Sequence, residues 1–171
     1  MDEEIVNRVA KSNLVSFDLE ELYVPGERVA LDMKNFLYQE LILKEKDFRE
    51  HIKNHNWKFY KDKHVAVLCS VDAIIPTWAF MLISSALHPF AKSIVAGTLQ
   101  ELENLLFTQQ LQIVDWQKFQ NLKVVVKGCS KVNVPVFAYV EVVNKLKPLA
   151  SSIMFGEACS TVPIYKKRTQ E

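Results

Sequence analysis

Glycine and cysteine are scarce in this sequence, which has four glycines and three cysteines in 171 residues. Loops that hold a dinucleotide or a phosphate need several closely spaced glycines, because only a residue without a side chain lets the backbone approach the phosphate. The sequence therefore argues against such a site. The cysteines are too few and too far apart for a disulfide framework, so we expect free thiols.

Neither sign of charge is in excess, with 21 basic residues, 20 acidic residues and a formal net charge of +1. A protein that binds nucleic acid needs a basic surface to neutralise the phosphates, so we predict no nucleic-acid partner. The N-terminus begins Met-Asp-Glu-Glu, which lacks the basic start and apolar run of a secretory signal. We therefore predict a cytoplasmic protein.

The chain contains an internal repeat. Residues 43–97 and 102–156 align without a gap and are identical at 13 of 55 positions. The identical pairs include Trp57 with Trp116, Pro76 with Pro135, and Gly97 with Gly156. A fixed offset of this kind predicts a duplicated structural unit.

Each unit has the pattern helix, strand, helix, strand. The first strands, residues 65–68 and 124–126, are short and apolar, as expected when helices cover both faces of a sheet. A crossover helix makes consecutive strands parallel. We therefore predict a three-layer α/β fold with a mainly parallel sheet, built from two duplicated helix-strand-helix-strand units. Residues 14–33, which contain the turn signal Pro25-Gly26, are predicted to add antiparallel N-terminal edge strands.

We expect one α/β domain over residues 1–171. Its predicted parts are an N-terminal helix and hairpin (1–42), a first repeat unit (43–97), a second repeat unit (102–156) and a C-terminal extension (157–171).

The segment 73–90 contains no Lys, Arg, Asp or Glu, and its eighteen residues are about the minimum for a membrane span. The aligned segment of the second unit carries Glu141, Asn144 and Lys145, and two copies of one unit should occupy similar environments. We therefore predict no membrane partner. The apolar helix is expected to be covered by the N-terminal segment or by another subunit, and we predict a homodimer.

The three cysteines each follow a predicted strand, and each precedes a serine. In parallel sheets ligands bind at the carboxyl ends of strands, where helix N-termini lower the pKa of a thiol. The tentative metal ligands are Cys69, Cys129 and Cys159, with Ser70, Asp72, Ser130, Lys131, Glu157 and Ser160 as neighbours. Zinc, iron, an iron-sulfur cluster or a persulfide would suit such thiolates. Equally, these cysteines are small buried residues followed by turn serines, and no CxxC pair supports a metal.

The histidines offer little chemistry at that edge. His51 and His55 lie four residues apart on a predicted helix, where an exposed polar face explains them. His64 and His88 precede strands and so lie at the opposite edge from the cysteines, where neither can serve as the base for a cysteine nucleophile. We therefore expect a protein that is not an enzyme.

Several motifs give the chain a resemblance to a known family. They are Glu3-Glu-Ile-Val-Asn-Arg-Val-Ala, Phe17-Asp-Leu-Glu-Glu-Leu-Tyr, Lys127-Gly-Cys-Ser-Lys and Ser152-Ile-Met-Phe-Gly-Glu-Ala-Cys-Ser-Thr-Val-Pro. Over essentially its full length the chain resembles a bacterial family catalogued as domain of unknown function 2480. The motifs of that family carry no established chemistry. The resemblance implies an association with iron-sulfur assembly proteins.

These observations lead to two hypotheses. In the first, the chain is an accessory protein of iron-sulfur, sulfur or metal handling, with Cys129 and Cys159 as principal ligands or sulfur acceptors and Cys69 as the third. In the second, it is a non-catalytic protein-protein interaction module that forms a homodimer and binds a partner through its apolar first-unit helix.

Overall fold

A computed structural model describes residues 13–128, 131–157 and 160–168. Over these residues the protein is a mixed α/β structure with two separate sheets. The chain divides into two compact units, Val24–Leu106 and a second unit formed by residues 1–23 and 107–171. We call them the continuous unit and the split unit and describe each by itself.

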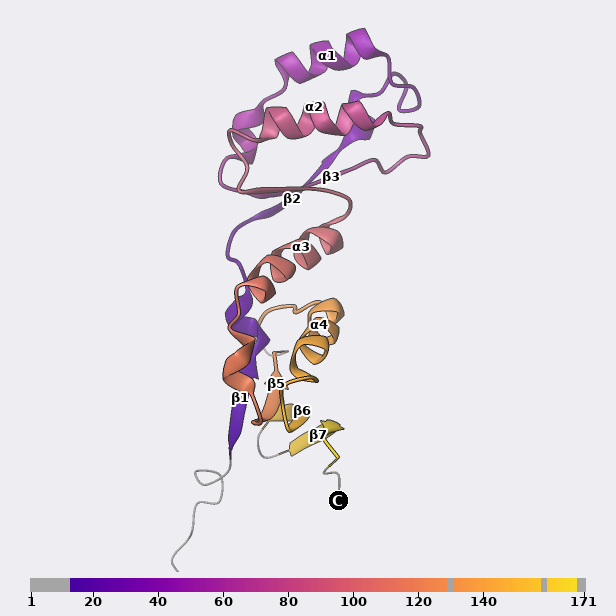
Figure 1. Cartoon of the computed structure of the whole chain (residues 1–171). Helices are drawn as coiled ribbons and strands as arrows, with labels where there is room; N and C mark the ends of the chain where they lie inside the picture. Colours follow the sequence, from indigo (N-terminus) through magenta and orange to yellow (C-terminus); the bar gives the residue numbers. More distant parts are fainter. Residues whose placement is uncertain (1–12, 129–130, 158–159, 169–171) are drawn as a thin grey trace, which may run out of the picture. The chain divides into compact units, whose positions relative to one another are not determined.

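The continuous unit holds a three-stranded parallel sheet in the order β2-β3-β4. Figure 1 labels its strands β2 and β3 and its helices α1 and α2. Its strands are β2 (Arg28–Asp32), β3 (His64–Leu68) and β4 (Ser93–Ala96). Its helices are α1 (Glu45–Asn54), α2 (Thr77–Leu87) and the first part of α3 (Leu99–Gln112), with short 3₁₀ helices at Met33–Phe36 and Trp57–Tyr60.

Helices cover both faces of the central strand of this unit. Val65 and Val67 point into a core with α1 and α2, while Ala66, between them, packs against Leu102 and Leu106 of α3. The alternation follows from the pleat of a strand, which sends successive side chains to opposite faces. Helices therefore pack against both faces of β3, as its short apolar sequence predicted.

The split unit holds a four-stranded sheet in the order β1-β5-β6-β7. Its elements are β1 (Leu14–Asp18), β5 (Lys123–Lys127), α4 (Val136–Leu146), β6 (Ser152–Glu157), β7 (Ser160–Lys166) and 3₁₀ helices at Leu19–Leu22 and Trp116–Phe119. The strand pairs are parallel except β6 with β7. Its core includes Phe107, from the last part of α3, together with Val124 and Val142.

The two units have matching elements at the predicted spacing. Strand β5 begins 59 residues after β3, and α4 begins 59 residues after α2. The indole N–H of Trp57 donates to the Ile52 carbonyl at 2.7 Å, and that of Trp116 donates to the Leu111 carbonyl at 3.1 Å. Each indole thus ties a helix to the 3₁₀ helix that follows it. The duplication of the unit stays a prediction.

The predicted antiparallel N-terminal edge strands were wrong, and so was the single sheet. Strand β1 pairs parallel with β5, and β2 pairs parallel with β3, so each enters a different sheet. The Pro25-Gly26 turn does not close a hairpin, because the chain passes there from the split unit to the continuous unit. The C-terminal extension also contains a strand, β7, that the sequence analysis did not foresee.

The expectation of a single domain stays a prediction. The longest described helix, α3, has 14 residues and mixed polarity. Within the described parts of the chain, no helix is long and apolar enough to cross a membrane.

The buried core predicts the effect of truncating Phe48, whose side chain is fully buried between the α1 and α2 helices. We expect Phe48→Ala to lower the free energy of unfolding by about 3–5 kcal/mol, because it removes apolar contacts and leaves a cavity. The control is Phe59→Ala, since Phe59 is 54% exposed, and we expect it to cost less than about 1 kcal/mol. Urea denaturation followed by circular dichroism measures both, and equal losses would contradict this core.

Candidate functional site

Cys69 follows the last residue of β3 at the carboxyl edge of the sheet in the continuous unit. Its side chain is half-buried against the core of α1 and α2, and its Sγ lies 3.5 Å from the Val71 carbonyl oxygen, to which the thiol donates. Its neighbour Asp72 is exposed. Around Cys69, therefore, the structure shows a packed thiol bonded to its own loop.

The other two cysteines, with Ser130, lie outside the described residues. The strands that precede Cys129 and Cys159, β5 and β6, are neighbours in the sheet of the split unit. Cys69 follows a strand of the other sheet. The expectation of one shared edge for the three cysteines depended on a single sheet. Their role as metal ligands stays a prediction, and over the residues that the structure describes no cluster of three His, Cys, Asp or Glu side chains could hold a metal.

The described neighbours of the cysteines in the split unit, which are Lys131, Glu157 and Ser160, are exposed. The backbone N–H of Lys131 donates to Glu20 Oε1 at 2.7 Å. The Glu157 carboxylate lies 3.8 Å from Lys127 Nζ, a weak ion pair at the surface. Ser160 is the first residue of β7. The first contact joins the loop after β5 to the 3₁₀ helix after β1, and the second joins the ends of β5 and β6.

Ser70 is held by Asp32, which ends β2. The Asp32 carboxylate accepts hydrogen bonds from the Ser70 hydroxyl at 2.5 Å, the Ser70 N–H at 3.1 Å and the Lys34 N–H at 3.0 Å. Burial alone would raise the pKa of Asp32, but these hydrogen bonds and the charge of Lys34 together lower it. A carboxylate with a lowered pKa is a poor general base near neutral pH, so this pair joins β2 to the loop after β3.

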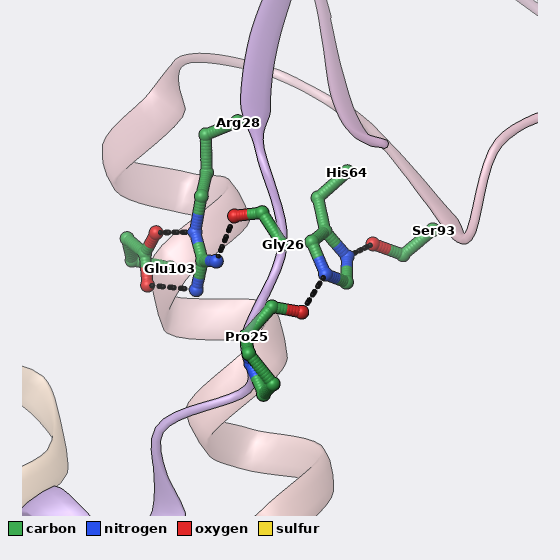
Figure 2. Close-up of polar contacts among 6 residues, drawn as sticks. All are labelled: Pro25, Gly26, Arg28, His64, Ser93 and Glu103. Atoms are coloured by element: carbon green, nitrogen blue, oxygen red, sulfur yellow. Dashed lines mark hydrogen bonds and ion pairs between the residues drawn. The ribbon is translucent and has the colours of Figure 1, made fainter. Parts of the chain in front are cut away.

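The opposite edge of the same sheet contains a buried histidine (Figure 2). His64, the first residue of β3, is 3% exposed. Its Nδ1 lies 2.7 Å from the Ser93 hydroxyl, and its Nε2 lies 3.2 Å from the carbonyl oxygen of Pro25. A carbonyl oxygen can only accept, so Nε2 is the nitrogen that donates. His64 therefore joins the Pro25-Gly26 turn to β3 and β4.

Beside it, Arg28 and Glu103 form an ion pair that links β2 to α3 (Figure 2). Arg28 Nε lies 2.5 Å and Nη2 3.3 Å from the two Glu103 carboxylate oxygens, and Nη1 donates to the Gly26 carbonyl at 2.6 Å. His64 lies at the edge predicted from the sequence, but its partners could not be predicted, because they lie 39 and 29 positions away along the chain. The side chains of this cluster form hydrogen bonds with one another and with the backbone, and they stabilise the packing of β2, β3, β4 and α3.

An open groove with both apolar and polar lining residues lies between α2 and β4. Its volume is about 590 Å³, and it is lined by Val67, Phe80, Met81, Ser84, Ser85, His88, Ile94 and Ala96. The sequence of α2 contains no charged residue, and Met81 is 67% exposed. Strand β4 is the last strand of its sheet, so no described strand pairs with its outer edge. The uncharged helix α2 and the unpaired outer edge of β4 thus lie on the two sides of this groove.

The corresponding place in the split unit is closed by a strand. A smaller hollow of about 400 Å³ lies between α4 and β6, and Ile164 of β7 forms part of its wall. Strand β7 pairs antiparallel with β6 along the edge that corresponds to the free edge of β4. The same part of the fold is therefore paired in one unit and open in the other.

These features define a mixed α/β protein with mainly parallel sheets, a packed cysteine loop and an open groove beside a free strand edge. A family model described as a protein of unknown function, DUF2480, matches residues 3–167, and the chain belongs to this family. The resemblance found in the sequence motifs is thereby confirmed. Searches of curated proteins and of solved structures give no match.

The lowered pKa of Asp32 predicts a pH-dependent effect of Asp32→Asn. The folded pKa lies below the ordinary value of 3.8, so the stabilisation is complete above that pH and is lost as the pH falls through the folded pKa. We expect the free energy of unfolding of the variant to be about 1 kcal/mol lower than that of the unmodified protein at pH 7. We expect this difference to shrink below pH 4. Urea denaturation between pH 7 and pH 3 measures it.

The control for this experiment is Asp72→Asn, because Asp72 is an exposed aspartate two residues beyond Ser70. We expect this substitution to change the free energy of unfolding by less than about 0.5 kcal/mol across the same range. An equal loss for Asp32→Asn at every pH would show that its carboxylate charge is not what stabilises the loop.

Proposed function

We propose that this chain is a non-catalytic protein-interaction module that binds a protein partner along the groove between α2 and β4. The observation that carries the proposal is the unpaired edge of β4 beside an uncharged helix face. An extended segment added to such an edge forms backbone hydrogen bonds, and the adjoining apolar surface adds affinity. Large exposed apolar side chains next to an open edge are typical of interaction sites.

The polar groups near the two sheet edges of the continuous unit support a non-catalytic role. Asp32 is bonded to Ser70, and Arg28 is bonded to Glu103. His64 is bonded on both ring nitrogens and is buried. A general base needs a free lone pair in reach of substrate, and these groups are engaged inside the fold. A cytoplasmic homodimer built from duplicated units belongs to the same proposal.

Photo-crosslinking in growing cells tests the groove. We expect p-benzoylphenylalanine in place of Met81 to give a covalent adduct with a protein that mass spectrometry can identify. The matched control is the same substitution at Val140, which lies 59 residues later on α4 and is 55% exposed. We expect far less adduct from position 140, because the adjoining strand edge is already paired with β7. The absence of any protein adduct at position 81 would exclude this interaction surface.

The sulfur and metal hypothesis is a second candidate. Strands β5 and β6 are parallel neighbours, and Cys129 and Cys159 each follow the end of one of them by two residues. Cysteine thiolates are ligands of zinc, iron and iron-sulfur clusters. In this proposal the partners are iron-sulfur assembly proteins, and Cys69 contributes little because its strand belongs to the other sheet.

Anaerobic purification tests this candidate. We expect iron, zinc or persulfide sulfur to copurify with the protein and to be lost in Cys129→Ser and in Cys159→Ser. Cys69→Ser is the matched control and should retain the bound element, because Cys69 follows a strand of the other sheet. Elemental analysis and a persulfide assay measure the stoichiometry, and a value near zero in the unmodified protein would remove this candidate.

A further inference from the structure

We propose that the groove between α2 and β4 is occupied by a second copy of this chain, with the two β4 strands paired antiparallel across a two-fold axis. The three strands of each copy would then form one continuous sheet. The inference rests on the proposed function and goes further, because it names the occupant and the geometry of the contact.

The split unit shows that this part of the fold accepts an antiparallel strand. Strand β7 runs antiparallel along β6, with Phe155 opposite Val162 and Ser152 opposite Lys166. The sequence of β6 begins Ser-Ile-Met-Phe, and β4 reads Ser-Ile-Val-Ala. Both strands follow a crossover helix at the same spacing. A glycine with positive φ lies near the end of each, Gly97 (143°) directly after β4 and Gly156 (116°) as the last residue but one of β6. The β4 edge therefore offers a pairing surface of the same kind.

Strand β4 also lacks the protection that the other sheet edges carry. Exposed edges are normally protected by a short strand, by proline, by charged side chains or by a bulge, because an unprotected edge pairs with other chains. Strand β4 is short, with four residues, but it lacks the protecting residues. The other described edge strands contain such residues: Asp18 in β1, Arg28 and Asp32 in β2, and Pro163 and Lys166 in β7. Strand β4 contains neither a charged residue nor a proline. We therefore expect the outer edge of β4 to be paired with another strand in the assembled protein.

The absence of charge favours a second copy as the occupant. A two-fold contact brings the same patch of both molecules together, so like charges in the patch would repel each other. On α2 the groove is lined by Phe80, Met81, Ser84 and Ser85, all uncharged, and the C-cap His88 is the titratable side chain in the lining. A partner recognised through its charge would need complementary charges here, and α2 has none. Two copies of this patch can therefore meet across a two-fold axis without repulsion between charged residues of α2.

The geometry of α2 agrees with this contact. With the axis perpendicular to the sheet, the α2 helices of the two copies lie on the same face and run antiparallel to each other. Packed helices lie about 8–10 Å apart, and small side chains at the contact allow the shorter separations. Ser84 and Ser85 line the groove in the second half of α2, and Met81, one turn earlier, is 67% exposed. Pairing the strands would therefore also bury the apolar face of α2.

Sedimentation equilibrium of the full chain tests the proposal. We expect a dimer for the unmodified protein and a dissociation constant raised by at least about 100-fold in Met81→Lys and in Ala96→Lys, because each places an unpaired charge in the contact. Both positions are exposed in the single chain, so the fold should tolerate the substitutions. The matched control, Val140→Lys on α4, should remain a dimer.

Hydrogen exchange of the unmodified protein provides a test that does not depend on any variant. We expect amides within residues 93–96 to exchange more slowly at high protein concentration than at low concentration, with no such change in β1. A monomer at concentrations up to about 100 μM, or a dimer unaffected by both lysine substitutions, would overturn the inference. A monomer whose position 81 crosslinks to a different protein would overturn the inference and leave the interaction module standing.

Discussion

Each of the two N-terminal strands pairs in parallel with a strand later in the chain, and both units depend on this constraint. Strand β1 reaches its partner β5 across 109 positions, from Leu14 to Lys123, and β2 reaches β3 across 36, from Arg28 to His64. A parallel pair cannot be closed by a tight turn, so each N-terminal strand needs a distant partner to bury its apolar residues. The continuous unit is consequently inserted between the two segments of the split unit.

The spacing of the repeat predicted helices, strands and their order correctly, because apolar strands and proline-led helices are encoded locally. Pro76 and Pro135 immediately precede α2 and α4, as their position in the aligned segments indicates. The pairing of β1 and β2 could not be found in this way, since alternating apolar residues do not specify a partner strand. The sequence did contain a sign that β1 and β2 are equivalent strands and not the two arms of a hairpin. Asp18 and Asp32 lie 14 residues apart, and each caps a 3₁₀ helix directly after its strand.

The candidate site could be predicted only in part, because the helix is encoded locally and the pairing of the strand edges is not. The lack of charge in α2, compared with Glu141 and Lys145 in α4, identified the helix that forms the groove. The edge of β4 could be recognised as open only once β7 was seen to pair with β6, and β7 contains Pro163, which gives it a weak strand signal. The grouping of the cysteines depended on the number of sheets, which the apolar pattern of single strands does not reveal.

The open edge of β4 results from the different paths that the chain takes after β4 and after β6. After Gly156 the chain turns back as β7 and pairs with β6. After Gly97 it enters α3 instead, because the Thr98 N–H donates to the Glu101 carboxylate at 2.6 Å and the Glu101 N–H approaches the Thr98 hydroxyl at 3.4 Å, a reciprocal cap that starts a helix. The hydrogen bonds from Thr98 lower the pKa of Glu101, so the cap keeps its charge at neutral pH. The segment that could have closed the β4 edge is thus committed to a helix.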